Sequence, residues 1–243
     1  MKASNKLTRQ QEADALLEKL LRRDRTIVRQ RVHLLGWRAM AQGGNAIKRL
    51  MDISVSLIAL LLLSPLFLVV ALCIRLTDGG PALFWQARVG KWGRVFAFPK
   101  FRSMVTNAEA LKAKLTEQNQ HGGEGITFKM KSDPRITWIG RIIRRTSIDE
   151  LPQLWCVLTG DMSLVGPRPA VVSEVSRYTL DNRRRLDIKP GLTCIWQVSG
   201  RSEIPFDQQC QLDVEYIEQQ STLADIQLLL KTIPAVITGK GAY

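Results

Sequence analysis

The sequence has few of the residues that metal hydrolases and serine hydrolases need. It contains two histidines, His33 and His121, and neither has a metal-ligand or triad partner at recognisable spacing. The four cysteines form no C-x-x-C pair, which argues against common zinc and redox motifs and is typical of reduced thiols in a cytosol-facing protein. G-x-x-x-x-G-K-[ST] and G-x-G-x-x-G motifs are also missing, so nothing supports a P-loop or NAD binding.

Acidic residues are in the minority, with 22 Asp and Glu against 35 Lys and Arg, and the net charge is +13. Such an excess favours polyanions, namely nucleic acid, anionic lipid or phosphorylated small molecules. The basic residues are not interleaved with aromatics as they are in proteins that bind single strands. A chain of 243 residues can bury one sizeable core, so we expect a single domain with accessory segments.

Residues 53–74 carry no charge and are numerous enough to cross about 30 Å of hydrocarbon. Ser64-Pro65 lies near the middle, where the proline predicts a bend or break and the Ser64 hydroxyl can bond to a preceding carbonyl. Both flanks are basic, which favours the cytoplasmic side for both ends. The residues leave two topologies open: a kinked spanning helix, or a helical hairpin that enters and leaves on one face.

Other patterns predict the remaining elements. Residues 1–50 form a basic segment whose leucine spacing predicts an amphipathic helix on anionic lipid, with a partner-binding or disordered arm as the alternative. Glycines between short apolar runs predict a β-hairpin within 79–104. Helices are predicted at residues 104–118, 136–145, 151–158 and 222–237, the last with a Thr-x-x-Asp cap.

The segment "TSIDELPQL", residues 146–154, carries two adjacent carboxylates, Asp149 and Glu150. Ser147 and Glu150 have the spacing of a helix capping box, but Pro152 would then leave the Ile148 carbonyl without its partner. A helix that starts one or two residues later removes this conflict and puts the carboxylates at a positive helix end, which favours their ionised forms. They are then candidates for a nucleophile or metal ligands, and a simple Asp cap stays open.

Several cationic segments are candidates for binding phosphate beside this acidic pair. Each is weak evidence alone, since turns commonly contain Pro, Gly and Arg, but together they predict a phosphate-handling site. They are Arg144-Arg145, Lys100 and Arg102 in "PKFRSM", Arg168 in "GPRP", and Lys189 and Arg201 in "KPGLTCIWQVSGR".

Four sequence stretches, in this order and spacing, resemble the bacterial sugar transferases that act on polyprenyl phosphate, the monotopic phosphoglycosyl transferases. The stretches are "KFRSM", "RRTSIDELPQLWCVLTGDMSLVGPRP", "KPGLTCIWQVSGR" and "LDVEYIEQQSTLADIQLLLKTIPAV". The resemblance covers residues 45–243 and is closest to the short exopolysaccharide-priming members. One departure is Cys194, where the family commonly has Gly, and the larger side chain could shift a tight loop of the substrate pocket.

The resemblance implies transfer of a hexose 1-phosphate from a UDP-sugar to undecaprenyl phosphate, with release of UMP. Asp149 would be the nucleophile that forms an aspartyl-phosphosugar intermediate, and Glu150 would help it hold Mg²⁺. Substrate phosphates or nucleotide would be contacted by Lys100, Arg102, Arg145, Arg168, Arg201 and Asp213. The sugar itself cannot be read from the sequence.

The resemblance also implies a fold and a location. We expect an α+β, helix-dominated protein: a basic extension at 1–47, a re-entrant membrane helix-break-helix at 48–76 with its break at Ser64 and Pro65, and a compact cytoplasmic domain at 77–243 with a small β-hairpin and amphipathic interfacial helices. The location would be the bacterial inner membrane, with the catalytic domain facing the cytoplasm and no nucleic-acid partner. A homo-oligomer is left open.

Two alternatives belong to other classes. A membrane-tethered basic adaptor that binds lipid or nucleic acid would have no activity and would be indifferent to Asp149. A membrane phosphatase or nucleotidyl transferase would use the same acidic pair with Mg²⁺ but would release different products.

Overall fold

The computed structural model describes residues 44–108, 111 and 133–238. Residues 1–43 of the basic extension, the C-terminal residues 239–243 and most of the helix predicted at 104–118 lie outside this part of the chain. The chain divides into two compact units, Met1–Lys48 and Arg49–Tyr243, and the second unit is described below. It is helix-dominated with small sheets, which confirms the predicted α+β class.

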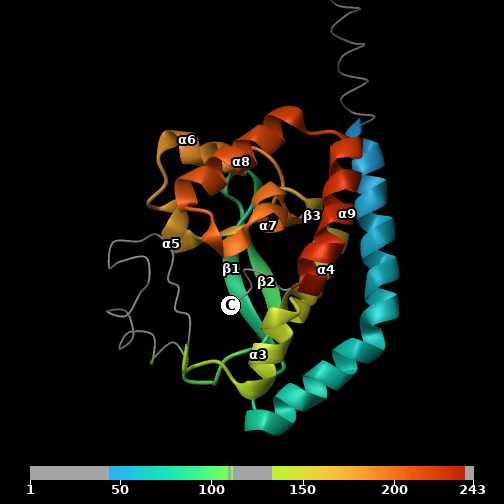
Figure 1. Ribbon diagram of the computed structural model, residues 1–243, viewed down its shortest axis with the longest axis vertical. Helices are drawn as coiled ribbons and strands as arrows, with labels where there is room; N and C mark the ends of the chain where they lie inside the picture. The colour runs from blue at the N-terminus through green and yellow to red at the C-terminus, as the bar shows by residue number, and fades with distance from the viewer. Residues whose placement is uncertain (1–43, 109–110, 112–132, 239–243) are drawn as a thin grey trace, which may run out of the picture. The chain divides into compact units, whose positions relative to one another are not determined.

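The elements keep the labels of Figure 1. The strands are β1 (Leu83–Val89), β2 (Val95–Phe101), β3 (Ser163–Val165), β4 (Ala170–Val171) and β5 (Gly191–Thr193). The α-helices that follow the long helix Gly44–Asp78 are α3 (Trp138–Arg145), α4 (Leu154–Thr159), α5 (Val172–Val175), α6 (Leu180–Arg183), α7 (Ile195–Ser199), α8 (Phe206–Gln219) and α9 (Thr222–Thr238). The 3-10 helices are η1 (Lys91–Gly93), η3 (Ile148–Gln153), η4 (Arg184–Leu186) and η5 (Arg201–Glu203).

The predicted hairpin is confirmed as strands β1 and β2, which pair antiparallel from Leu83↔Phe101 to Val89↔Val95. Strand β4 joins the free side of β1, so β2 is an edge strand of a sheet ordered β2-β1-β4. Pro99 lies in β2, as is common for proline in edge strands because it cannot donate to a ladder. Strands β3 and β5 form a separate parallel pair.

The long helix Gly44–Asp78 is continuous and bends partway along (Figure 1), so the predicted bend is observed and the helix-break-helix that the family resemblance implied is not. Pro65 cannot donate to the carbonyl of Leu61, four residues earlier. The Ser64 hydroxyl takes over that role and donates to the Leu61 oxygen at 2.8 Å. Because the orphaned carbonyl is satisfied, the helix bends without ending.

Both arms of this helix pack against the same unit. Leu60 and Leu63, before the proline, contact a cluster that contains Phe98 and Leu228. Residues after the proline join a second cluster, made up of Val70, Ile74, Phe101, Ile139 and Ile143. Strand β2 therefore contributes to both clusters and links the two arms.

The outer surface of the helix stays apolar and uncovered. Within its most apolar window only 11% is buried inside the structure. Leu61, Leu62 and Leu68 are between 66% and 75% exposed. The helix is long and apolar enough to cross a membrane, and its exposed face is of the kind that contacts lipid.

Polar side chains tie both ends of the helix to the globular part. Arg49 donates to the carbonyl oxygens of Val157 and Leu158 at 2.7 and 2.8 Å, at the C-terminal end of α4. The buried Asp52 accepts hydrogen bonds from the hydroxyl and the following amide of the β3 segment Ser163–Leu164, at 3.1 and 3.0 Å. At the other end, Asp78 pairs with Arg102.

The structure confirms the predicted helices at 136–145 and 222–237 as α3 and α9. The predicted Thr-x-x-Asp cap of α9 is wrong. Ser221 Oγ instead accepts from the Ala224 amide at 3.2 Å, one residue before the expected cap. Asp225 is fully buried and accepts a hydrogen bond from the Tyr216 hydroxyl at 2.5 Å, which joins α9 to α8.

Candidate active site

A cavity of about 970 Å³ lies beside the β1-β2 hairpin and is closed by η3, the β3–β4 loop and helices α7 and α9. This volume is at the upper end of what small-molecule sites offer. Charged side chains dominate part of its wall. In the described part of the chain they are Arg88, Lys100, Arg102, Asp133, Arg135, Arg144, Asp149, Glu150, Arg168, Glu174, Arg185 and Arg201.

The acidic pair lies in the 3-10 helix η3, which follows α3 after a sharp turn at Ser147. Ser147 adopts a left-handed conformation with φ 56° and makes no side-chain cap bond, so no capping box forms. Pro152 fits inside η3, and the α-helix begins only at Leu154. The capping box is therefore absent, as Pro152 led us to expect. The α-helix that was expected to start near Asp149 is wrong, because a 3-10 helix occupies Ile148–Gln153 and α4 begins only at Leu154.

Glu150 is bound by two cations. Its carboxylate accepts from both terminal nitrogens of Arg168, with Oε1–Nη2 at 2.5 Å and Oε2–Nη1 at 3.3 Å. Lys100 Nζ lies 3.6 Å from Glu150 Oε1. Burial alone would raise the pKa of Glu150, but the charges of Arg168 and Lys100 outweigh it and hold this pKa well below its usual range.

Asp149 has different surroundings. It lines the cavity and is 9% exposed, and its carboxylate makes no hydrogen bond or ion pair with any residue that the structure describes. Burial, together with the negative charge of Glu150, raises the pKa of Asp149 to about 6. The sequence predicted the opposite direction from a helix dipole. The dipole of the short 3-10 helix η3 would lower the pKa of Asp149, but desolvation and the like charge of Glu150 raise it by more.

The loop that carries Arg168 is held rigidly on both sides. The Gly166 amide donates to the Thr193 carbonyl at 3.0 Å, and the Gly191 amide donates to the Pro167 carbonyl at 2.9 Å. On the other side Arg88 Nη1 donates to the Pro169 carbonyl at 2.9 Å. The Arg168 fork is thus fixed before any substrate binds.

Cations crowd this end of the cavity. Burial lowers the pKa of Lys100 to about 8, although Glu150 opposes the shift. Burial and the charge of Arg168 lower the pKa of Arg88 to about 10. Glu150 is the only carboxylate in the described part of the chain that pairs with Arg168 and Lys100, so these two cations leave positive charge that an incoming phosphate can neutralise.

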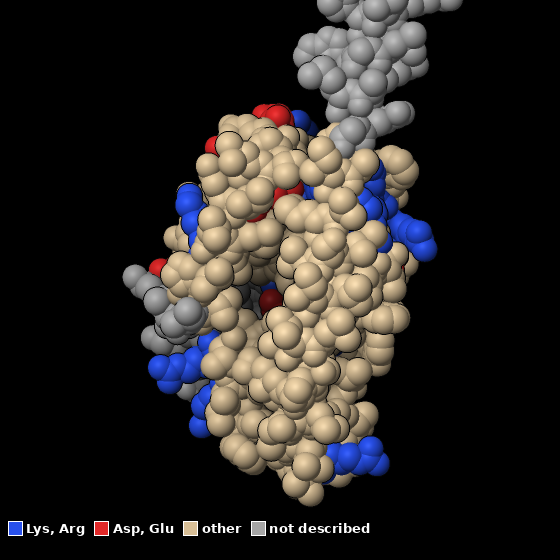
Figure 2. Space-filling model, turned by 90° about the vertical axis from the view of Figure 1, so that its right-hand side faces the viewer, with Lys and Arg blue, Asp and Glu red and all other residues tan. Residues whose placement is uncertain are grey.

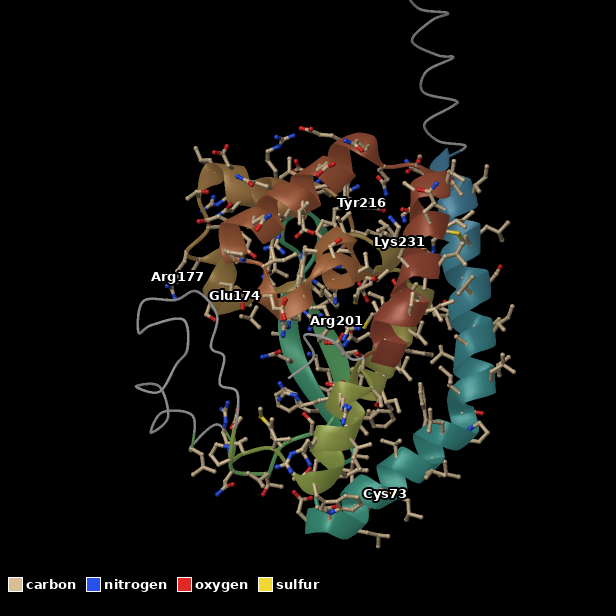
Figure 3. The ribbon with its side chains drawn as sticks, in the orientation of Figure 1. Cys73, Glu174, Arg177, Arg201, Tyr216 and Lys231 are labelled. Atoms are coloured by element: carbon tan, nitrogen blue, oxygen red, sulfur yellow. The ribbon has the colours of Figure 1, made fainter. Side chains whose placement is uncertain are left out.

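Of the remaining candidate cations, Arg102 and Arg201 also line the cavity, whereas Lys189 does not. Arg102 pairs with Asp78, and its Nη1 is buried without a partner among the described residues. Arg201 follows α7 with a left-handed backbone, φ 52°, and its Nε donates to the Gln197 carbonyl at 3.3 Å. Figure 3 shows Arg201 near the middle of the unit, close to α9.

The structure does not bring two predicted contact residues to the cavity. Arg145 points to the exposed side of α3, and its neighbour Arg144 lines the cavity instead. Asp213 is buried behind the wall and binds Arg185 through Nε and Nη2, both at 2.7 Å. Because a helix turns 100° per residue, the choice between adjacent arginines depends on how α3 packs.

Sequence reasoning missed other residues of the wall. Arg88 lies one residue before the end of β1, and no recognised motif includes it. Asp133 and Arg135 in "SDPR" form an ion pair at 2.6 Å, and a Pro between opposite charges could have drawn attention. Cys194 is fully buried, and its thiol donates at 3.1 Å to Gln197, which lines the cavity.

The donor set near Asp149 fits a magnesium ion only when the ion binds together with a diphosphate. Mg²⁺ commonly uses one or two carboxylates plus substrate phosphates and keeps several waters. Asp149 offers unpaired oxygens, whereas Glu150 would have to release part of its contact with Arg168. No group of three or more His, Cys, Asp or Glu side chains suited to a metal occurs within residues 44–108 and 133–238.

Comparison with known proteins identifies one family over most of the chain. The family model described as bacterial sugar transferase matches residues 43–239. The chain is 50% identical over 196 residues to the galactosyl transferase CpsE of Streptococcus agalactiae, covering 80% of this chain and 43% of the relative. It is 46% identical over 200 residues to the undecaprenyl-phosphate galactose phosphotransferase of Salmonella typhimurium, covering 81% and 42%.

A third relative has nearly the same extent. The exopolysaccharide production protein ExoY of Sinorhizobium fredii is 38% identical over 202 residues, which cover 82% of this chain and 89% of the relative. The chain thus spans less than half the length of the first two relatives and most of the third.

Proposed function

The chain belongs to the bacterial sugar transferase family, and we propose that it transfers a hexose 1-phosphate from a UDP-sugar to undecaprenyl phosphate, the priming step of surface or exopolysaccharide synthesis. The names of two relatives, one a galactosyl transferase and one an undecaprenyl-phosphate galactose phosphotransferase, support this class of reaction. They also make UDP-galactose the first donor to test.

The observation that carries the proposal is the contrast between two adjacent carboxylates in one cavity. Glu150 is neutralised by Arg168 and Lys100, whereas Asp149 lines the cavity and its oxygens have no partner among the residues that the structure describes. A carboxylate can attack phosphorus only when its lone pairs are free. The geometry therefore favours Asp149 as the nucleophile and Glu150 as the residue that holds Arg168 and Lys100 in place.

The reaction would proceed in two successive displacements at the same phosphorus. In the first, an oxygen of Asp149 attacks the β-phosphorus of the UDP-sugar, the bond from that phosphorus to the oxygen bridging the two phosphates breaks, and UMP leaves. In the second, an oxygen of undecaprenyl phosphate attacks the same phosphorus, and the bond to Asp149 breaks. Asp149 is regenerated and the product is an undecaprenyl-diphosphate sugar.

The cations of the cavity would stabilise the charge that moves in both steps. Arg168 presents a fixed fork suited to two phosphate oxygens, and Lys100 and Arg88 add charge beside it. Mg²⁺, when bound with the diphosphate near Asp149 and Glu150, would neutralise phosphate charge and assist the departure of UMP. We propose it as the cofactor on the chemistry of this donor set.

The membrane arrangement that best fits the packing is re-entrant. A straight helix from Arg49 to Asp78 would extend about 44 Å, enough to place its ends on opposite sides of a bilayer. Yet Arg49 and Asp78 both bind side chains or backbone of the same unit. We infer a monotopic protein with both helix ends and the cavity on the cytoplasmic side, where nucleotide sugars are made.

Mass spectrometry of the purified protein tests the nucleophile. With UDP-galactose and Mg²⁺ but no lipid acceptor, we expect the peptide with Asp149 to gain the mass of a hexose phosphate while UMP is released. The Asp149→Asn variant should form no adduct and lose about four to six orders of magnitude in turnover, as removal of nucleophiles does elsewhere.

Asp161→Asn is the matched control, since that carboxylate is partly exposed and outside the cavity. Full turnover by Asp149→Asn would refute the nucleophile assignment. Release of free phosphate without a lipid-linked sugar would favour a phosphatase, and unchanged lipid binding with no turnover in any variant would favour an adaptor.

A further inference from the structure

The cavity has a second, apolar wall that the chemistry at Asp149 does not use. This part of its lining comes from Leu164, Leu192 and helix α9. The α9 residues that line it are Leu229, Thr232, Ala235 and Val236. A phosphate site thus lies in the same cavity as an uncharged surface.

Three sides of helix α9 have different surroundings. Leu229, Thr232 and Val236 are spaced i, i+3 and i+7 and form one stripe along the cavity. Asp225 and Leu228 are buried against the core. The third stripe is apolar and exposed, with Leu223 at 66%, Ile226 at 42%, Leu230 at 61% and Ile233 at 58%.

The exposed stripe continues the apolar surface of the long helix. Leu60 and Leu63 of that helix pack against the cluster that includes Leu228 and Leu229, and Figure 1 shows α9 beside its upper arm. An exposed apolar surface that extends over two neighbouring helices is typical of contact with a membrane. Helix α9 therefore lines the cavity with one side and exposes an apolar surface, suited to contact with lipid, on another side.

Figure 2 views the side of the unit that carries these two helices. Most of the visible face is uncharged, and a hollow in it has an acidic side chain at its bottom. The hollow thus opens on the uncharged face of the unit. A ligand that enters there must combine an uncharged chain with an anionic head.

We propose that the α9 stripe of Leu229, Thr232 and Val236, with Leu164 and Leu192, is the subsite for the isoprenoid chain next to the phosphate of the acceptor lipid. This inference rests on the function proposed above. The lipid phosphate passes the stripe and attacks the phosphorus on Asp149, while the remaining chain stays in the bilayer. The nucleotide sugar occupies the charged part of the cavity lining that includes Arg135, Arg144 and Glu174.

The two half-reactions can be measured separately, and only the second should depend on this subsite. The first is UMP release and adduct formation from UDP-galactose without lipid. The second is loss of the isolated adduct on mixing with undecaprenyl phosphate. We expect Leu229→Trp and Val236→Trp to change the first rate by no more than about twofold and to slow the second about tenfold or more, the scale of apolar pocket discrimination.

The matched control is Leu230→Trp, which places the same bulk one residue later on the exposed stripe and should leave both half-reactions unchanged. Adduct formation by each variant shows that it is folded. Should Leu229→Trp also block the adduct, Leu229→Ala replaces it. That variant should form the adduct normally and raise the KM for undecaprenyl phosphate by about tenfold.

Three outcomes overturn the subsite. They are an unchanged second half-reaction in both tryptophan variants at the stripe, an equal slowing by Leu230→Trp, and an unchanged KM for the lipid in Leu229→Ala. Failure of the unsubstituted protein to form any adduct would instead refute the proposed function, so the two results are distinguishable.

Discussion

At the scale of single residues, Asp149 and Glu150 show how position in a cavity separates two like groups. They are adjacent in the chain and both line the cavity. One pKa is raised to about 6 by burial and its neighbour's charge, and the other is held low by two cations. Arg168 produces much of this difference, because its fork binds one carboxylate and leaves the other open.

The geometry of that fork gives a first prediction. Arg168→Lys keeps the charge but loses the two parallel bonds to Glu150, so phosphate and Glu150 would no longer be oriented together. We expect adduct formation to slow about 100-fold, comparable with the loss of one fixed charge-stabilising donor. Rapid-quench measurement of UMP release checks this. Arg141→Lys, on the exposed side of α3, should leave the rate unchanged, and full activity of Arg168→Lys would contradict a role for the fork.

Asp213 gives a second prediction, which concerns stability. Its carboxylate is 1% exposed and is bound to Arg185, which is 6% exposed. Asp213→Ala leaves a buried guanidinium unpaired and should lower the free energy of unfolding by about 3–5 kcal/mol. Thermal unfolding in detergent measures this.

A double-mutant cycle with Arg185→Ala tests the cause. Removing both partners should cost less than the sum of the single losses, because no unpaired charge remains. Additive losses would show that the two side chains act independently.

At the scale of elements, the site depends on two close backbone contacts. A Cβ on Gly140 of α3 would lie 1.9 Å from the Ser103 carbonyl oxygen, so α3 can approach the end of β2 only with glycine there. A Cβ on Gly191 of β5 would lie 2.0 Å from the Gly166 amide nitrogen. The first contact positions η3, which follows α3, and the second positions the Arg168 loop.

Gly191→Ala therefore tests whether the loop is positioned by β5. The added methyl forces the backbones of β3 and β5 apart, which should lower the free energy of unfolding by about 3 kcal/mol or more and also slow adduct formation. Gly44→Ala is the control, since nothing lies within 4 Å of its added Cβ, and it should change stability by no more than about 0.5 kcal/mol. Equal effects in the two variants would exclude the close approach as the cause.

At the largest scale, the bent helix from Arg49 to Asp78 is bound at both ends to the rest of its own unit. Arg49 and Asp52 near one end and Asp78 at the other are all bound to the globular part. An uncharged surface runs along the helix and α9 on the outside. This combination supports a protein held against one face of a membrane.

Cysteine labelling tests the topology. Cys73 is replaced by Ala, and the buried Cys156, Cys194 and Cys210 are kept. One cysteine is then added at a time near either end of the bent helix, as Lys48→Cys or Trp85→Cys, and the chain without an added cysteine gives the background labelling. Because both ends are expected in the cytoplasm, a membrane-impermeant maleimide should label both in inside-out vesicles and neither in intact cells. A permeant maleimide should label both in either preparation. Labelling of one position from outside would establish a spanning helix.

The sequence by itself determined the features that depend on near neighbours. The apolar run, the hairpin and helices α3 and α9 follow from composition and periodicity over a few turns or strands. The strain between Pro152 and a Ser147 capping box was also visible, because a proline acts on residues within one turn. The bend at Pro65 was predicted for the same reason, although the bond from Ser64 to Leu61 kept the helix continuous.

Only the tertiary structure decided how the charges are paired. Arg88 and Arg168 meet the acidic pair because β1, η3 and the β3–β4 loop pack around one cavity. Packing also places Arg144 in the cavity lining and leaves Arg145 exposed, and it buries Asp213 outside the lining. Ion pairing and desolvation act through space between residues far apart in the chain, so no local pattern reveals which of the two carboxylates remains free.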